Sequence, residues 1–389
     1  MSFGARALIR LGALEHNLEV IRKAAPGCKV MAVIKANAYG HGMVHVAQHL
    51  AHVDAFAVAR VPEALELRAN GITGRIVLLA GVMNTSELAA AMEYEFEPVV
   101  HCPLQLDLLD HSIGGKVNVW CKFDTGMNRL GFDPDDAADI LARLRRSPGV
   151  NEIRLMTHLA SADEPAGRGT MEQLERFRPV ASGFDGDVSI ANTPATLGWK
   201  VAVRAQSEFG FRGDNWIRPG IALFGVSPFG DKTGVELGLK PVMQFEARLI
   251  ATKPLKAGHR VGYKGAFLSD RDTTIGIISA GYGDGYSRHF RSGTPVLING
   301  RRVPVIGNVS MDMIAVDLGT APEDRVGDIA TLWGDGLPVE EVAPWADAIP
   351  YELVCGVMNR EDSEVVALSL IHISEPTRPP LLSRMPSSA

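Results

Sequence analysis

The sequence lacks the features of several protein classes. Its 389 residues include only four cysteines, with no C-x-x-C pair, so we predict neither a zinc ribbon nor a disulfide framework and expect a reducing compartment. No run of about 18 apolar residues is present to span a bilayer. The opening segment, MSFGARALIRLG, lacks the apolar stretch of a signal peptide. We therefore expect a cytoplasmic protein with no membrane partner.

Concentrated positive charge is also missing. The chain has 39 basic and 45 acidic side chains, a net charge of −6, and no block dense in Lys and Arg. Nucleic acid and anionic lipid are therefore excluded as expected partners. The composition, 46% hydrophobic and 22% charged, is that of an ordinary globular chain long enough for two domains.

Short apolar, β-branched runs recur in the first 225 residues, and helical signals separate them. The eight runs are Val30–Ile34, Asp54–Val58, Arg75–Leu79, Glu97–His101, Lys116–Phe123, Ile153–His158, Asp187–Ala191 and Ile217–Gly225. Apolar residues from Leu11 to Ile21 share one helical face, and Asp133-Pro134 is an N-cap followed by a first-turn proline. Eight alternating units predict a closed (β/α)8 TIM-type barrel. An open doubly wound sheet is the alternative, although no G-x-G-x-x-G follows the first strand.

The pattern changes after the barrel. Strand-like segments joined by Gly, Pro and Asn turns, with no convincing helix, predict a mostly β domain. We assign residues 1–235 to the barrel and 236–360 to the β domain. Residues 361–389, rich in Ser and Pro, we interpret as a disordered tail or as translated vector or adapter sequence, and they are left out of fold reasoning.

Candidate reactive groups follow the barrel strands. Lys35 ends the first strand, where burial would keep its amine neutral and able to form a Schiff base. A snorkelling surface lysine is the alternative for this residue alone. Thr193 and the Gly220 and Ile221 amides follow the last two strands, where barrels often bind phosphate. A phosphate site opposite a lysine suits pyridoxal phosphate.

Eight motifs, in one order along residues 5–360, resemble those of alanine racemases, which are fold-type III pyridoxal-phosphate enzymes. They are VIKANAYGHG around Lys35, KFDTGMNRLGF around Arg129, THLASAD from Thr157, IANTPA around Asn192, WIRPGIALFG around Arg218, GYGDGYSR around Tyr282, VSMDM around Met311 and YELVCG around Tyr351. The resemblance implies a barrel plus a β domain, a homodimer, and active sites completed by the partner's β domain. It also implies a supply of D-alanine for cell-wall peptidoglycan.

The resemblance implies two bases. Lys35 would hold the cofactor and act on one face of the substrate Cα, and Tyr282 of the partner subunit on the other, since inverting a stereocentre by proton exchange is easiest with one acid or base on each side. A tyrosine is a poor base at its ordinary pKa of about 10, so we expect His158 and Arg218 to be cationic neighbours that assist it. Arg218 would also face the pyridine nitrogen and disfavour its protonation.

The remaining roles are likewise implied by the family. Arg129 would hold the substrate carboxylate or the cofactor's phenolic oxygen, and Lys122 matches a lysine that is often carbamylated; an unmodified structural lysine is the alternative. The Met311 amide would meet the substrate carboxylate, and Asp312 would position its loop. The cofactor-binding set is Lys35, Tyr39, Asn192, Thr193, Arg218, Gly220, Ile221 and Tyr351.

A histidine stripe suggests another chemistry. His41, His45 and His49 follow at intervals of four residues, with His52 beyond, a spacing that could bind a metal on a helix. Gly42 stands where a zinc protease needs glutamate, so we expect no metal and a solvated helix face.

Three other functions stay open at this stage. A broad-specificity amino-acid racemase would differ only in pocket size. A pyridoxal-phosphate carrier shares the barrel but lacks the β domain. A fold-type III decarboxylase would need an acidic residue in the place of Arg218.

Overall fold

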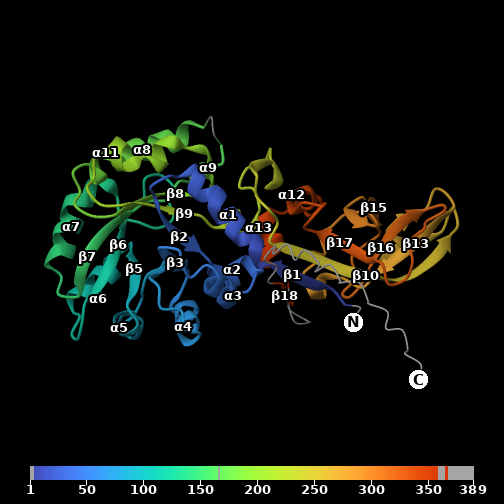
Figure 1. Cartoon of the computed structure of the whole chain (residues 1–389), viewed down its shortest axis with the longest axis horizontal. Coiled ribbons are helices and arrows are strands. Elements are labelled where there is room, and N and C mark those ends of the chain that lie inside the picture. Colours follow the sequence, from blue (N-terminus) through green and yellow to red (C-terminus); the bar gives the residue numbers. More distant parts are fainter. Residues whose placement is uncertain (1–3, 165–166, 358–363, 367–389) are drawn as a thin grey trace, which may run out of the picture.

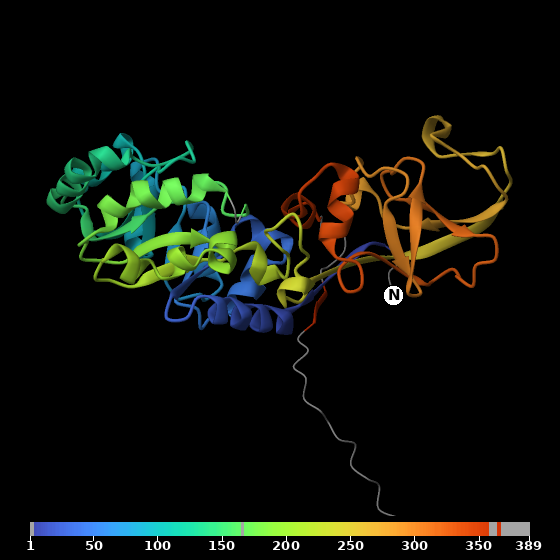
Figure 2. The same cartoon turned by 90° about the horizontal axis from the view of Figure 1, so that it is seen from above.

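The computed structural model describes residues 4–164, 167–357 and 364–366. A helix-covered barrel and a second, mostly β body lie side by side along the long axis of the molecule (Figure 1). The view from above shows the same two bodies, joined near the yellow and blue segments (Figure 2). No helix in the described part of the chain is both long and apolar enough to cross a membrane.

Eight parallel strands close the barrel in chain order, with the last paired to the first. They are β2 (Lys29–Val33), β3 (Ala55–Val58), β4 (Ile76–Leu78), β5 (Phe96–Val100), β6 (Val117–Lys122), β7 (Val150–Met156), β8 (Val188–Asn192) and β9 (Asn215–Arg218). The predicted TIM-type barrel is confirmed. The eighth strand is shorter than predicted: it ends before Pro219, which has no N–H, and the 3₁₀ helix η2 (Ile221–Phe224) follows.

Helices connect the strands and cover the outside of the barrel (Figure 1). They are α1 (Leu11–Ala24), α2 (Lys35–Gly40), α3 (Met43–His49), α4 (Val61–Ala69), α5 (Thr85–Glu93), α6 (Pro103–Asp110), α7 (Ala137–Arg146), α8 (Arg168–Ala181), α9 (Thr193–Gly198), α10 (Lys200–Val203) and α11 (Ala205–Phe209). The apolar face predicted for the first helix is buried, with Leu14 and Leu18 inaccessible to solvent. Asp133 caps the short 3₁₀ helix η1 (Pro134–Asp136) that precedes α7, as its sequence indicated.

The second body is an eight-stranded sheet that closes on itself through an additional β10–β13 pairing. Its strands, in spatial order, are β13 (Thr273–Ile278), β16 (Ile314–Gly319), β15 (Arg301–Ile306), β14 (Pro295–Ile298), β17 (Ile329–Trp333), β10 (Met243–Leu255), β1 (Arg6–Arg10) and β18 (Glu364–Val366). A small hairpin, β11 (Arg260–Val261) with β12 (Phe267–Leu268), projects from it. This body confirms the predicted β architecture after the barrel.

Three features differ from the expectation. The N-terminal strand β1 pairs with β10 and so lies in the second sheet, outside the barrel. The second body also contains helices α12 (Val339–Val342) and α13 (Pro350–Cys355), although none was expected there. Residues 364–366, placed by the sequence in the tail, pair with β1. The other residues of the expected tail lie outside the described part, and the domain boundaries stay predictions.

Candidate functional site

Lys35 lies two residues after the end of β2, at the mouth of the barrel, and begins an unusual turn. The four residues Ala36–Tyr39 have φ of 52–54° and ψ of 40–54°, so they form a left-handed turn without glycine. Each such residue costs about 1–2 kcal/mol, so surrounding contacts must hold the turn. One of these is the Ala36 N–H, which donates to Glu63 Oε1 at 2.8 Å. The turn fixes the direction in which Lys35 leaves the strand.

The amine of Lys35 lies in a cationic, buried setting. Burial, and then the charge of Arg129, lower the Lys35 pKa below its ordinary value. Burial also lowers the pKa of Lys122, at the end of β6, to about 8, with Arg218 and Arg129 adding to the effect. Both amines are therefore more easily deprotonated, and more nucleophilic, than a surface lysine.

His158 lies in buried, cationic surroundings that disfavour its protonation. Burial lowers its pKa well below the ordinary value, and the charges of Arg218, Lys122 and Arg129 lower it further. These surroundings do not favour a positively charged His158, and its expected role as a cationic neighbour of Tyr282 stays a prediction.

Arg218 is the fixed cation of the site. It ends β9, is 4% exposed, and donates from Nη1 to Ser189 Oγ at 2.5 Å and from Nη2 to the carbonyls of Thr157 at 2.6 Å and Ile190 at 3.2 Å. Burial lowers its pKa to about 9, which keeps it charged at neutral pH. Within the described residues its Nε–H has no hydrogen bond and no carboxylate pairs with it, so this donor is available to a ligand.

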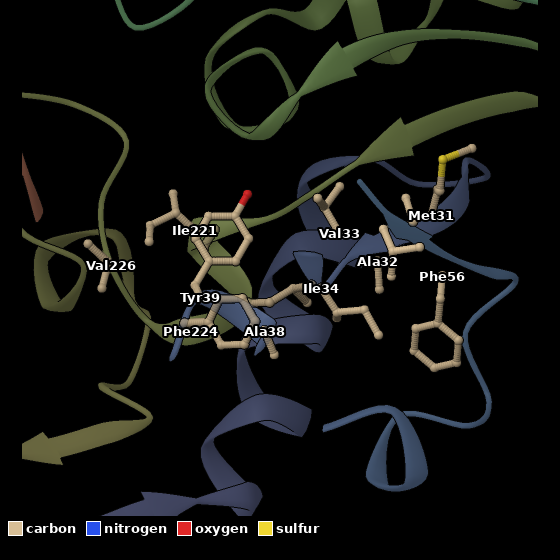
Figure 3. Close-up of a cluster of buried hydrophobic side chains, with 14 of the residues drawn as sticks. Met31, Ala32, Val33, Ile34, Ala38, Tyr39, Phe56, Ile221, Phe224 and Val226 are labelled. Atoms are coloured by element: carbon tan, nitrogen blue, oxygen red, sulfur yellow. The ribbon is translucent and has the colours of Figure 1, made fainter. Parts of the chain in front are cut away.

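Five residues at the carboxyl ends of β2, β8 and β9 and on α13 form what we call the anion cradle: Tyr39, Thr193, Gly220, Ile221 and Tyr351. The Gly220 N–H donates to Thr193 Oγ1 at 2.8 Å. A Cβ on Gly220 would lie 2.5 Å from the Tyr39 hydroxyl, so this glycine lets the tyrosine approach the backbone. Figure 3 shows Tyr39 beside Ile221 and Phe224. Ile221 starts η2, and helix starts leave N–H groups free for anions.

Tyr351 enters the cradle from the second body. Its ring centroid lies 6.2 Å from that of Tyr39. Burial raises the pKa of both hydroxyls, so both stay protonated and can donate. The helix that carries Tyr351, α13, is tightly seated on α2, because a Cβ on Gly40 would lie 2.1 Å from the Val354 carbonyl oxygen.

Asn192 has a structural contact in addition to its expected binding role. Its side-chain oxygen caps α9 by accepting the Ala195 N–H at 3.3 Å, and its amide donates to the Leu159 carbonyl at 3.0 Å. Both bonds fix the loop that presents Thr193. The role as a cofactor ligand stays a prediction.

The Arg129 loop is organised by Asp124. The Asp124 carboxylate accepts the N–H groups of Gly126 and Asn128, each at 3.0 Å, and of Arg129 at 2.8 Å. Although burial alone would raise the Asp124 pKa, these bonds lower it. The D-T-G sequence is an Asx-turn signal, so this positioning residue could have been recognised from the sequence.

Tyr282, Met311 and Asp312 lie on the second body, on loops that precede and follow its strands. Tyr282 is 40% exposed and Met311 52% exposed. The groups that shift the pKa values of Lys35 and His158 lie on the barrel and on α13, and Tyr282 is not among them. The structure therefore assembles the barrel residues in one place and leaves Tyr282 and Met311 open to solvent.

The histidine stripe forms a solvated helix face only in part: on α3, His45 is exposed and His49 is half-buried, whereas His41 and His52 lie outside that helix. His41 is 1% exposed and precedes helix α3, while His49 and His52 lie within 3.6 Å and 3.3 Å of Glu15. No cluster of His, Cys, Asp and Glu suited to a metal occurs among the described residues. The periodicity failed because Gly42, with φ of 87°, interrupts the helix.

Comparison with protein families covers most of the chain. Residues 9–228 match the model of "Alanine racemase, N-terminal domain", and residues 242–365 match "Alanine racemase, C-terminal domain". The alanine racemase of Vibrio cholerae serotype O1 is 47% identical over 358 residues, which are 92% of this chain and 96% of the relative. That of Shewanella loihica is 48% identical over 357 residues, 91% and 97% of the two chains.

Solved structures give the same result. The biosynthetic alanine racemase of Pseudomonas aeruginosa superposes with a TM-score of 0.87 at 41% identity, over 95% of this chain and 100% of that one. The alanine racemase of Acinetobacter baumannii gives a TM-score of 0.82 at 34% identity, over 94% and 100%.

Proposed function

We propose that this chain, which belongs to the alanine racemase family and is an isomerase that interconverts L- and D-alanine, carries out that reaction with pyridoxal phosphate held by Lys35. The observation that carries the cofactor proposal is the joint placement of a buried lysine with a lowered pKa and the anion cradle at one barrel mouth. We further propose that the product serves cell-wall peptidoglycan. We also propose that the enzyme is cytoplasmic, and its four cysteines, none of which forms a disulfide, support that location.

The residues present fit this cofactor. The cradle offers two protonated tyrosine hydroxyls, a threonine hydroxyl and helix-start amides to a phosphate. Arg218 offers an uncommitted Nε–H from a buried, charged guanidinium to a ring nitrogen. When bound, pyridoxal phosphate supplies an electron-withdrawing ring that makes the substrate Cα–H acidic. Because Arg218 only donates, it would leave the ring a weaker electron sink and favour simple reprotonation.

Two residues of this chain would move the proton. The Lys35 amine, whose pKa is lowered by burial, is suited to take a proton from one face of Cα and, once protonated, to return it. Tyr282 of the partner subunit would serve the other face. Support for this arrangement comes from the exposure of Tyr282 and Met311 on a body that lies beside its own barrel. The proposed homodimer would place those loops over the partner's barrel mouth, with the Met311 amide meeting the substrate carboxylate and Asp312 positioning that loop.

Arg129 and Lys122 would act as a pair. The Arg129 guanidinium is suited to hold the substrate carboxylate or the cofactor's phenolic oxygen, because it donates as a planar fork. The buried Lys122 amine, with its pKa lowered to about 8, can take up carbon dioxide as a carbamate and so become an anionic partner for Arg129. With ¹³C-bicarbonate we expect a carbamate NMR signal that Lys122→Arg abolishes. Lys29→Arg is the control, because ion pairing with Asp54 raises the Lys29 pKa.

The experiment that tests the cofactor assignment is reductive trapping. Borohydride treatment of the purified enzyme should bleach its visible absorbance and leave a phosphopyridoxyl group on Lys35, found by peptide mass spectrometry. Chiral chromatography of alanine, lysine and arginine incubations tests the substrate, and we expect D-alanine to be the main product. A label on another lysine, or none, would overturn the Lys35 assignment. Equal turnover of lysine or arginine would replace alanine racemase with a broad-specificity racemase.

A further inference from the structure

His41 is a buried polar residue beside the anion cradle with no part in the proposed reaction. It follows the left-handed turn and is 1% exposed. Its Nδ1 atom lies 2.8 Å from the Tyr39 carbonyl oxygen and 3.0 Å from the Ala38 carbonyl oxygen. Both neighbours are acceptors only, so Nδ1 must carry the proton and donate to them.

The other side of the ring supports this tautomer. Burial lowers the His41 pKa to about 4, so the ring is neutral and carries a single proton at physiological pH. The Nε2 atom is buried without a hydrogen-bond partner among the described residues. His41 belongs to the wall of a small, mainly apolar cavity that Trp333 and Val354 also line. Because Nε2 has no acceptor in the described part of the chain to which it could donate, it is the nitrogen that carries no proton.

His41 also contacts the second half of the cradle. Its ring stacks on Phe224 with centroids 4.4 Å apart and planes at 26°. Phe224 lies in η2, the helix that starts at Ile221, and its centroid is 5.2 Å from that of Tyr39. Tyr39 and Phe224 are neighbours in Figure 3. One side chain thus links the left-handed turn to the helix that follows β9.

We propose that His41 is a positioning residue for the phosphate group: its Nδ1–H holds the Tyr39 backbone, and with it the Tyr39 hydroxyl, against Gly220 and η2. The Ala38 carbonyl also accepts the His41 backbone N–H at 3.1 Å. Loss of the His41 side chain therefore leaves Ala38 with a hydrogen bond but removes the one to the Tyr39 carbonyl. This inference rests on the proposed function, because the ligand it serves is pyridoxal phosphate.

Two variants separate hydrogen bonding from packing. His41→Phe keeps an aromatic ring to stack on Phe224 but removes the donor. His41→Asn removes the ring but places an amide N–H where Nδ1 stands. We expect His41→Phe to raise the Kd of the apoenzyme for pyridoxal phosphate about tenfold, the usual size of one lost buried hydrogen bond. His41→Asn should stay within about threefold. Quenching of tryptophan fluorescence on titration measures both constants.

A second pair keeps the test decisive if His41→Phe does not fold. His41→Gln carries the same amide one bond further out, so it should lose affinity where His41→Asn does not. Pyridoxal, which lacks the phosphate, should bind wild type and His41→Gln within about threefold of each other. In a Tyr39→Phe background the loss of affinity caused by His41→Gln should shrink, since coupled residues are not additive.

Four outcomes are informative. The inference fails if His41→Phe binds pyridoxal phosphate as tightly as wild type, if Asn and Gln lose affinity equally, or if pyridoxal binding falls as much as that of the phosphate ester. If wild type itself binds no pyridoxal phosphate, the proposed function fails instead, and the two failures are thereby distinguished.

Discussion

The backbone N–H of Tyr282 donates a hydrogen bond to the carbonyl oxygen of Ser310 at 3.1 Å. The next residue, Gly283, donates to the Met311 carbonyl at 2.8 Å. The loop that carries the proposed second base is therefore fastened to the loop that carries the proposed carboxylate-binding amide. These two backbone hydrogen bonds hold the two loops together as one unit.

Gly281 makes this unit possible, and substituting it should separate the loops. A Cβ on Gly281 would lie 2.3 Å from the carbonyl oxygens of both Ser310 and Met311. Because backbone atoms must shift to admit it, Gly281→Ala should cost roughly 1–3 kcal/mol and lower kcat with little change in pyridoxal-phosphate affinity. Gly230→Ala is the control, since nothing lies within 4 Å of a Cβ there. Equal kcat values for the two variants would contradict the coupling.

In the left-handed turn after Lys35, replacing alanine with glycine should not lower stability, unlike the same change in a helix. Ala36 has φ of 53° and ψ of 54°, a region that glycine enters without a Cβ clash. Ala36→Gly should therefore leave stability unchanged or raise it by about 1 kcal/mol. Ala90→Gly, in the regular helix α5, should lower stability by about 1 kcal/mol. Urea unfolding of both variants checks this, and equal destabilisation would show that the turn is not strained.

The residues that end strands could be recognised from the sequence, and those set by distant packing could not. Lys35 and Thr193 come within two residues of the ends of apolar strands, and the carboxyl ends of these strands must meet in a barrel; the structure places both residues at its mouth. By contrast, β1 pairs with β10, a strand about 240 residues further along the chain: Arg6 lies opposite Glu246. No local sequence pattern encodes that pairing. The N-terminal strand was therefore missed.

Electrostatic properties were equally hidden. His158 was predicted to end its strand, and β7 ends two residues earlier, at Met156. The pKa of His158 depends on burial and on Arg218 and Lys122, which only folding brings near it. His41 looked like a member of a helical stripe because its spacing fits one, but the positive φ of Gly42 ends that periodicity. In this site the pKa values and the handedness of the backbone are set by tertiary structure, so the local sequence does not reveal them.

Acid stability should depend on His41. Burial lowers the folded-state pKa to about 4, below the ordinary 6.5, so the unfolded chain binds a proton more readily between these values. Stability is then unaffected above about pH 6.5 and falls as pH drops toward 4. From pH 7 to 4.5, wild-type apoenzyme should lose about 2 kcal/mol more than His41→Asn, which has no titrating group. If the urea midpoints of wild type and His41→Asn fall by the same amount between pH 7 and 4.5, His41 is not the cause of the acid sensitivity.

We propose that each active site combines Lys35 of one subunit with Tyr282 of the other, and subunit mixing distinguishes this arrangement from a site built within one subunit. Lys35→Ala and Tyr282→Phe should each be nearly inactive, because each removes the base from one face of the substrate. When the two variants are mixed in equal amounts and allowed to exchange subunits, half of the dimers should be hybrids with one intact site. We expect recovery of about a quarter of wild-type D-alanine formation. No recovery in a mixture shown to contain hybrid dimers would contradict it.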